Sequence, residues 1–240
     1  MRAIVTGATG GIGRAIVEKL LAENIHVIAT GTRVEALEKL SAETGCETRA
    51  VDICKPDAVE AVLGGLDADV LVHAAGILGP QMPIHEMPPD MVASILDINI
   101  TGTINLLRSV VPGMRAADKG TIILLGSICG TVPGTGPGVY SASKAALQAL
   151  AANLRYELYG NAIRVSEIRL GRVRTGIHNQ LESEDEFYEG FECVLPENVA
   201  ETVFHIIDSP AFVDLSTVEM MPTRQVPGGA RFSTAVSEKS

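Results

Sequence analysis

The chain has 240 residues, of which 46% are hydrophobic, and this is enough apolar material for a large α/β domain and excludes a disordered or fibrous chain. Its 19 basic and 29 acidic side chains give a formal net charge of −10, which leaves no basic surplus to neutralise the phosphates of a nucleic acid. Charges or glycines interrupt every apolar run before the roughly 18 residues that a membrane span requires. The first residues pass directly into a strand pattern, without the long apolar centre of a signal peptide, so we expect a cytoplasmic protein with neither nucleic acid nor a membrane as its partner.

Apolar runs of strand length alternate with segments of helical period along most of the chain, which indicates βαβ units wound into a parallel sheet. The apolar runs predict strands at residues 3–6, 26–30, 48–52, 70–73, 121–125 and 163–170, with a last short strand at 217–220. The helical period predicts helices at residues 11–23, 34–44, 55–63, 89–114, 140–159 and 197–208. This regular repetition predicts one domain over residues 1–226.

Two stretches near the C-terminus depart from this pattern. Residues 176–195 are rich in acidic and aromatic side chains and contain no basic residue beyond His178, and we expect them to form a mobile lid. The tail at residues 227–240 is rich in Gly, Ser and Thr, so we expect it to be flexible or ordered only against another subunit.

The four cysteines give no sign of a metal centre. Cys46, Cys54, Cys129 and Cys193 lie far apart, with no CxxC pair and no histidine at a ligand spacing. We therefore expect reduced, mostly buried thiols, no disulfide and no bound metal.

A glycine-rich turn, TGATGGIG at residues 6–13, follows the first strand and opens the first helix. Gly7, Gly11 and Gly13 fit a TGxxxGxG spacing, in which glycines let the backbone approach a pyrophosphate and the helix N-terminus supplies free N–H groups. A tight strand-to-helix connection can also use such glycines for packing alone. Asp52, at the end of another predicted strand, has two interpretations as well: it accepts a hydrogen bond from an adenine amino group, or it caps the helix that starts at Lys55.

Tyr140 and Lys144 are four residues apart at the start of a predicted helix, so both side chains leave the same face. A phenol with a pKa of about 10 is a poor base near neutrality, but an ammonium at about 4–5 Å can favour the phenolate by on the order of 3–4 kcal/mol, so the tyrosine could shuttle protons. Ser127, just past a predicted strand, could hold a substrate oxygen against the phenol. Asn99, a poor helix former, could kink its helix with a water that relays protons to Lys144. Each of these residues alone also has an ordinary structural explanation.

Together these features resemble the short-chain dehydrogenase/reductase family over about residues 1–222, because the glycine turn, Asp52, Asn99, Ser127 and YSASK at 140–144 agree with it in order and spacing. The resemblance implies a single Rossmann-type domain, α/β with a doubly wound parallel sheet, and a nicotinamide cofactor at the C-terminal ends of the strands. It implies that Tyr140 is the general acid/base, that Lys144 holds the nicotinamide ribose and lowers the pKa of Tyr140, and that Ser127 and Asn99 complete the catalytic set. The cofactor contacts that it implies are Gly7, Thr9, Gly11, Ile12, Gly13, Thr32, Arg33, Asp52, Ile53, Ala74, Ala75, Gly76, Tyr140, Lys144, Val173 and Thr175.

The chain departs from the family pattern at two places. His73 stands where the family usually has the asparagine of Asn-Ala-Ala-Gly, and Leu170 stands where it usually has the proline of Pro-Gly. An imidazole can replace the amide's bond to a neighbouring strand, whereas loss of the proline loosens the loop before the predicted lid.

The end of the second predicted strand bears on the choice of nucleotide. An NAD enzyme typically has a carboxylate near Gly31 for the ribose hydroxyls, whereas Thr32 and Arg33 offer a hydroxyl and a guanidinium to a 2′-phosphate. We favour NADP(H), with NAD as the alternative because Arg33 could instead stack on adenine.

Within the family, residues 26–40 and 215–222 look most like the branch that acts on 3-hydroxy acids and serine, including sulfonate analogues. The substrate contacts that we expect are Ser127, Cys129, Tyr140, Arg172 and Arg174. The two arginines could form an anion site, or they could pair with the acids of the lid. An acidic lid would slow an anionic substrate, so a neutral alcohol, ketone or polyol, in a pocket lined by Leu78, Ile128, Cys129 and the lid aromatics, is the alternative.

A nucleotide-binding sensor without turnover is a further alternative, but it would not need Tyr140, Lys144, Ser127 and Asn99 together. The helices predicted at residues 89–114 and 140–159 have more apolar surface than one sheet face can cover. We therefore expect a homo-oligomer, for which the resemblance implies a tetramer and leaves a dimer open.

Overall fold

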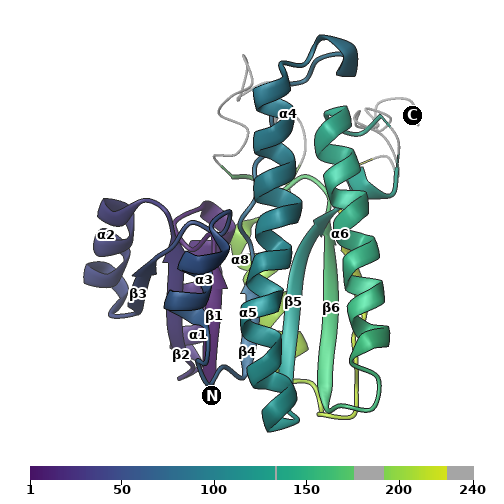
Figure 1. Cartoon of the computed structure of the whole chain (residues 1–240). Coiled ribbons are helices and arrows are strands. Elements are labelled where there is room, and N and C mark those ends of the chain that lie inside the picture. Colours follow the sequence, from purple (N-terminus) through teal and green to yellow (C-terminus); the bar gives the residue numbers. More distant parts are fainter. Residues whose placement is uncertain (133, 176–191, 226–240) are drawn as a thin grey trace.

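The computed structural model describes residues 1–132, 134–175 and 192–225 and contains a seven-stranded parallel sheet in the order β3-β2-β1-β4-β5-β6-β7 (Figure 1). The strands are β1 (Arg2–Thr6), β2 (His26–Gly31), β3 (Glu47–Ala50), β4 (Val70–His73), β5 (Gly120–Ser127), β6 (Ile163–Leu170) and β7 (Thr217–Met220). The chain runs outward from β1 to β3 and then returns to place β4 on the other side of β1. The strand order thus reverses between β1 and β4, and in doubly wound sheets ligands bind outside the C-terminal ends of the strands at such a point. The predicted fold class is confirmed.

Two buried layers hold the sheet between helices. One layer packs β1, β2, β4 and β6 against α1 (Gly11–Ala22), α2 (Val34–Thr44) and α8 (Pro196–Asp208). The other packs the opposite face against α3 (Pro56–Leu63), α5 (Gly102–Ala117) and α6 (Gly138–Glu157). Figure 1 shows α5 and α6 side by side in front of the sheet, with α8 behind it. Because both faces are covered, the central strands are almost continuously apolar, and this is the pattern that predicted them.

The long helix predicted at residues 89–114 is interrupted in the structure. α4 (Pro89–Leu96) passes into a π-helical turn, η2 (Asp97–Thr101), and then into α5. Asn99 lies in the middle of η2, so the α-helical pattern is interrupted at the asparagine where we predicted a kink, and the kink itself remains a prediction. The short turns η1 (Ile84–Glu86) and η3 (Ile128–Gly130) precede α4 and follow β5.

Two of the strand ends that differ from the prediction bear on the candidate site residues. β5 continues through Ser127, so Ser127 is the last residue of the strand and does not follow it. β3 ends at Ala50, and Asp52 therefore lies in the connection to α3. Strand ends depend on pairing partners, which a single stretch of sequence does not contain: Ser127 is paired with Leu170 of β6.

The predicted lid lies outside the described residues except for 192–195, and the predicted tail lies wholly outside them. Among the described residues, no helix is long and apolar enough to cross a membrane. The four cysteines are free thiols, but only Cys46 is buried, so the expectation of mostly buried thiols is wrong. The other three are partly exposed and lie outside the strands and α-helices, in the connection from β3 to α3, in η3 and before α8.

Candidate active site

The glycine turn packs directly against the segment that follows β4. Gly7 has a φ of +65°, and a Cβ on it would lie 2.7 Å from the backbone nitrogen of Ala75. A Cβ on Gly13 would overlap the carbonyl group of Gly7. α1 begins at Gly11, and because its N-cap is Gly10, no side chain caps the first turn of the helix. The turn is thus a cradle of bare backbone at a helix N-terminus, which fits the pyrophosphate of a dinucleotide.

Arg33 lies across this cradle at the end of β2. Its guanidinium donates hydrogen bonds to Thr9, at 3.2 Å to the carbonyl oxygen and 3.0 Å to Oγ1. Thr32 and Arg33 are both exposed, so a hydroxyl and a guanidinium stand side by side where an NAD-specific site would have a carboxylate.

The segment after β3 also reaches the cradle side of the sheet. Asp52 Oδ1 accepts a hydrogen bond from the Cys54 backbone at 2.9 Å, so one carboxylate oxygen stabilises the turn that leads into α3. Asp52 does not cap α3, because the N-cap of this helix is Lys55 and no side chain bonds to its first turn. The interpretation of Asp52 as a partner of adenine remains a prediction. The side chain of Ile53 is 7% exposed and packs in the layer against α3 and α5.

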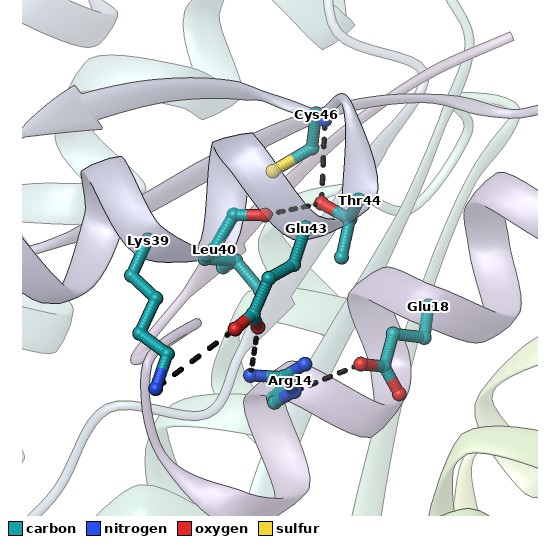
Figure 2. A network of polar contacts seen from close by, with 7 residues as sticks. All are labelled: Arg14, Glu18, Lys39, Leu40, Glu43, Thr44 and Cys46. Carbon is teal, nitrogen blue, oxygen red and sulfur yellow. Dashed lines mark hydrogen bonds and ion pairs between the residues drawn. The ribbon is translucent and has the colours of Figure 1, made fainter.

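A polar network fixes α1 to α2 behind the cradle (Figure 2). Arg14, the residue after Gly13, pairs with Glu18 on its own helix at 2.8 Å and with Glu43 on α2 at 2.7 Å. Lys39 approaches the same Glu43 carboxylate at 3.9 Å. The side chains are 39–48% exposed in the two shorter pairs, so each pair contributes little individually.

Lys144 and Tyr140 lie one turn apart at the start of α6. Lys144 is buried, and its Nζ donates to the Leu125 carbonyl at 2.8 Å and lies 5.7 Å from the centre of the Tyr140 ring. Burial lowers the pKa of Lys144 to about 8, with Cys129 and Glu167 acting in the opposite direction. Burial also raises the pKa of Tyr140, while a hydrogen bond with Ser127 opposes this rise. In the protein alone, desolvation of the phenolate therefore raises the Tyr140 pKa, and the lowering that we expected from Lys144 is not found.

Ser127 and Asn99 face the same place from β5 and η2. Ser127 Oγ is 3.4 Å from the carbonyl oxygen of Leu170, to which it donates, and accepts from the Cys129 backbone at 3.2 Å. The Asn99 carboxamide is fully engaged: Oδ1 accepts from Ile77 N–H at 2.9 Å, and Nδ2 donates to the Ile77 carbonyl at 2.9 Å and to Ser143 Oγ at 3.0 Å. Asn99 therefore ties the loop after β4 to α6.

The four predicted catalytic residues come together beside the loop at Ala74, Ala75 and Gly76. A Cβ on Gly76 would lie 3.2 Å from Asn99 Oδ1 and 3.7 Å from Lys144 Nζ. The cradle touches the other side of the same loop, through Gly7. One short loop thus separates the cofactor cradle from the titratable side chains.

His73 performs the structural role expected of it and one that the sequence did not predict. Its Nδ1 lies 2.7 Å from Thr6 Oγ1 on β1, so the imidazole does bond to the neighbouring strand. Its Nε2 lies 2.8 Å from Thr103 Oγ1, a contact with α5 that we did not expect. The ring is 2% exposed, and burial lowers its pKa to about 3.

The remaining candidate residues lie on the segment after β6: Val173 and Thr175 are the expected cofactor contacts, and Arg172 and Arg174 are the expected substrate contacts. Val173 is buried and forms a β-bridge with Val194, while the side chain of Thr175 would lie 3.5 Å from a Cβ on Gly11, beside the cradle. Arg172 and Arg174 both lie close enough to Cys193 to act on its thiol. His178 lies outside the described residues. Cys129 lies close enough to the reactive pair to affect the pKa values of both Tyr140 and Lys144.

Comparison with known proteins agrees with this geometry. The family model for short chain dehydrogenases matches residues 1–186. The chain belongs to this family. It is therefore an oxidoreductase, and it is similar to the family's branch of NADP-dependent 3-hydroxy acid and serine dehydrogenases.

Individual relatives and solved structures cover nearly the whole chain. The chain is 35% identical to the NADP-dependent 3-hydroxy acid dehydrogenase YdfG of Escherichia coli, over 95% of this chain and 98% of that protein. It is 34% identical to a serine 3-dehydrogenase of Rhizobium radiobacter, over 92% of this chain and 94% of that protein. Among solved structures, the closed form of serine dehydrogenase complexed with NADP+ matches with a TM-score of 0.90 at 34% identity, over 95% of this chain and 98% of that one.

Proposed function

We propose that the protein is an NADP-dependent dehydrogenase that interconverts a small 3-hydroxy acid, or a hydroxy sulfonate, and the corresponding carbonyl compound. The observation that carries this proposal is the convergence of Tyr140, Ser127, Lys144 and Asn99 at one edge of the sheet, across a single loop from the cradle. The named activities of the 3-hydroxy acid and serine dehydrogenases support the substrate class.

The cradle and Arg33 would hold the cofactor. Gly7, Gly11 and Gly13 leave room for the pyrophosphate, and the guanidinium that Thr9 holds at the end of β2 suits a 2′-phosphate. When bound, the nicotinamide supplies or accepts the hydride. NAD remains the alternative cofactor, because Arg33 is the only cation of this short β2 end and can also stack on adenine.

Proton transfer falls to Tyr140. Because its pKa is raised, the side chain is a neutral phenol near pH 7 and can donate its proton to a carbonyl oxygen that Ser127 holds. Lys144 has a pKa of about 8, which is close enough to pH 7 for its ammonium group to release and take up a proton. In the opposite direction Tyr140 must first lose its proton, so alcohol oxidation should accelerate as the pH rises. Asn99 holds the loop and α6 in register around these groups.

Arg172 and Arg174 are the groups that we propose for an anionic substrate, since they flank Val173 on the segment that passes the site. A neutral alcohol, ketone or polyol is the second candidate. The acidic character of residues 182–192 favours it, because like charges there would slow the entry of an anion.

The decisive experiment is the initial rate of NADP reduction with 3-hydroxy acids, hydroxy sulfonates and neutral alcohols of equal chain length. We expect the anions to have the higher kcat/KM, and Arg174→Gln to lower kcat/KM for the anions while leaving the neutral members unchanged. A preference for the neutral alcohols would overturn the substrate class. An absence of turnover with every class, together with retained NADPH binding, would favour the sensor.

We also propose that a second copy of the chain covers α5 and α6, which form a groove of about 690 Å³. Its lining includes the apolar residues Ile104, Leu107, Val111 and Leu150 and the oppositely charged Arg108, Arg115 and Glu157. A surface with both charges can pair with itself across a twofold axis. Sedimentation should show a dimer or tetramer that Ile104→Glu dissociates, whereas Val34→Glu, at an exposed position on α2, should leave it intact. A wild-type monomer would refute this assembly.

A further inference from the structure

His73 is a buried titratable group that takes no part in the proton chemistry proposed above. It ends β4, and its two ring nitrogens contact hydroxyl groups from two different elements. Nδ1 lies 2.7 Å from Thr6 Oγ1 on β1, and Nε2 lies 2.8 Å from Thr103 Oγ1 on α5. One imidazole thus joins the sheet to the helix that covers it.

The hydrogen bonds that link Thr6, His73, Thr103 and the Asn99 carbonyl form a hydrogen-bonded chain, and the donors in it all point in one direction. Thr103 Oγ1 donates its only proton to the Asn99 carbonyl oxygen at 2.8 Å, so toward His73 it can only accept. Nε2 of His73 therefore carries the ring hydrogen. The ring is neutral near pH 7, because burial, together with the nearby charge of Lys144, lowers its pKa to about 3. Nδ1 is then an acceptor for Thr6.

The two ends of this hydrogen-bonded chain are parts of the candidate active site. At one end, Thr6 Oγ1 accepts from the Ala75 N–H at 3.4 Å, in the loop against which Gly7 packs. At the other end is the Asn99 carbonyl. Asn99 Oδ1 and Lys144 Nζ both approach the same loop, so a shift of the Asn99 turn would change the surroundings of the ammonium.

A π-helical turn is rare, and it is found frequently at functional sites as a single turn inside an α-helix. The hydroxyl bond from Thr103 to the Asn99 carbonyl supplies support from α5, and His73 anchors that hydroxyl to the sheet.

We propose that His73, as the neutral Nε2–H tautomer, is a positioning residue that links the loop beside the glycine turn to the Asn99 turn and, through Thr103, sets the surroundings of the Lys144 ammonium. The proposal rests on the proposed function, since it gives a role to the Lys144 side chain in turnover.

The tautomer is tested by nitrogen NMR of the full-length protein labelled at histidine. We expect the His73 ring to show an Nε2–H pattern that does not change between pH 5 and pH 8. An Nδ1–H pattern, or a ring that titrates in this range, would overturn the hydrogen-bonded chain. This test requires no activity, so it stands even if the proposed function fails.

The coupling to turnover is tested with Thr103→Val, Thr103→Ser and Ser109→Ala. Ser109 is the matched control: it is another buried hydroxyl on α5, and its Oγ reaches the Val59 carbonyl at 3.5 Å, outside the chain described here. We expect Thr103→Val to lower kcat about tenfold, the effect of one lost buried hydrogen bond, with the KM for NADPH unchanged.

The pH–rate profile separates positioning from stability. In Thr103→Val the midpoint of the kcat profile should move, and Thr103→Ser, which keeps the hydroxyl, should restore both kcat and the midpoint. Ser109→Ala should lower the melting temperature alone. If Thr103→Val behaves like Ser109→Ala, the positioning role is refuted. If wild-type protein turns over no substrate while the NMR pattern holds, the proposed function has failed and the chain of hydrogen bonds has not.

Discussion

The two sides of the loop at residues 74–76 are built in opposite ways. On the cradle side, between β1 and α1, the decisive feature is missing side-chain volume: a Cβ on Gly7 or Gly13 would collide with backbone. On the other side, between β5, η2 and α6, the decisive features are buried polar side chains with defined partners, such as Lys144 on the Leu125 carbonyl. The cradle half of the site thus depends on its shape, and the other half depends on the protonation states of its polar side chains.

This difference predicts that the two halves fail differently. Damage to the cradle should reduce cofactor affinity and stability, because backbone must move. Loss of a hydroxyl group from the polar half, such as that of Tyr140, should reduce the rate while leaving the cofactor bound, because the cradle itself remains intact.

Tyr140→Phe should have the largest effect. Removing the only proposed proton donor should slow hydride transfer by about 10²–10⁴-fold, or about 3–5 kcal/mol, since that is the usual contribution of general acid–base catalysis. Single-turnover absorbance of the nicotinamide measures the rate, and fluorescence titration measures NADPH binding, which should be unchanged. A fully active Tyr140→Phe protein would refute the mechanism.

Gly13→Ala is the corresponding change in the cradle. Its new Cβ would overlap the Gly7 carbonyl, and overpacking of this kind costs about 3 kcal/mol at the upper end of its usual range. We expect loss of NADPH affinity together with a lower free energy of unfolding. Gly113→Ala, at an exposed helical position where the nearest atom would lie 3.4 Å away, is the control and should bind NADPH normally.

Arg33→Ala tests which nucleotide the cradle favours. Loss of a charge-assisted hydrogen bond to a 2′-phosphate should weaken NADPH binding by about 1.5–3 kcal/mol. NADH lacks this phosphate and serves as the internal control, with little change expected by calorimetry. Equal losses for both nucleotides would instead indicate that Arg33 stacks on adenine.

The neutral buried His73 makes stability depend on pH. Its pKa is about 3 in the folded protein against an ordinary value of 6.5, so the unfolded chain binds the proton more tightly. Stability is therefore greatest above pH 6.5 and falls as the pH drops toward 3, by about 2 kcal/mol between pH 7 and pH 5. Urea unfolding at the two pH values measures this loss, and His73→Asn should remove it. A loss that persists in His73→Asn would assign the dependence to other groups.

The sequence predicts well what is local or periodic. The alternation of apolar runs predicts the sheet, the glycine spacing predicts the turn at residues 6–13, and the four-residue spacing of Tyr140 and Lys144 predicts their common face. The interruption of the α-helix at Asn99 also agrees with a local property, the poor helix propensity of asparagine.

What depends on distant partners could not be predicted. Thr103 is an ordinary helical residue until folding brings His73 of β4 against it. The rise in the pKa of Tyr140 results from burial by several elements, whereas the spacing to Lys144 alone suggested a fall. The length of β5 likewise depends on its pairing with β6, which is 43 residues away at Ser127.

The smallest effect should come from the exposed network behind the cradle (Figure 2). Glu43→Gln removes the charge that pairs with Arg14 and Lys39, but these side chains are partly solvated, so we expect a loss of less than about 1 kcal/mol of unfolding free energy. NADPH affinity should not change, because the cradle is held by backbone packing of Gly7 and Gly13 and not by the position of α2. A tenfold weaker NADPH affinity in Glu43→Gln would show that the ion pairs position α1. The cradle would then depend on charged side chains as well as on its backbone shape.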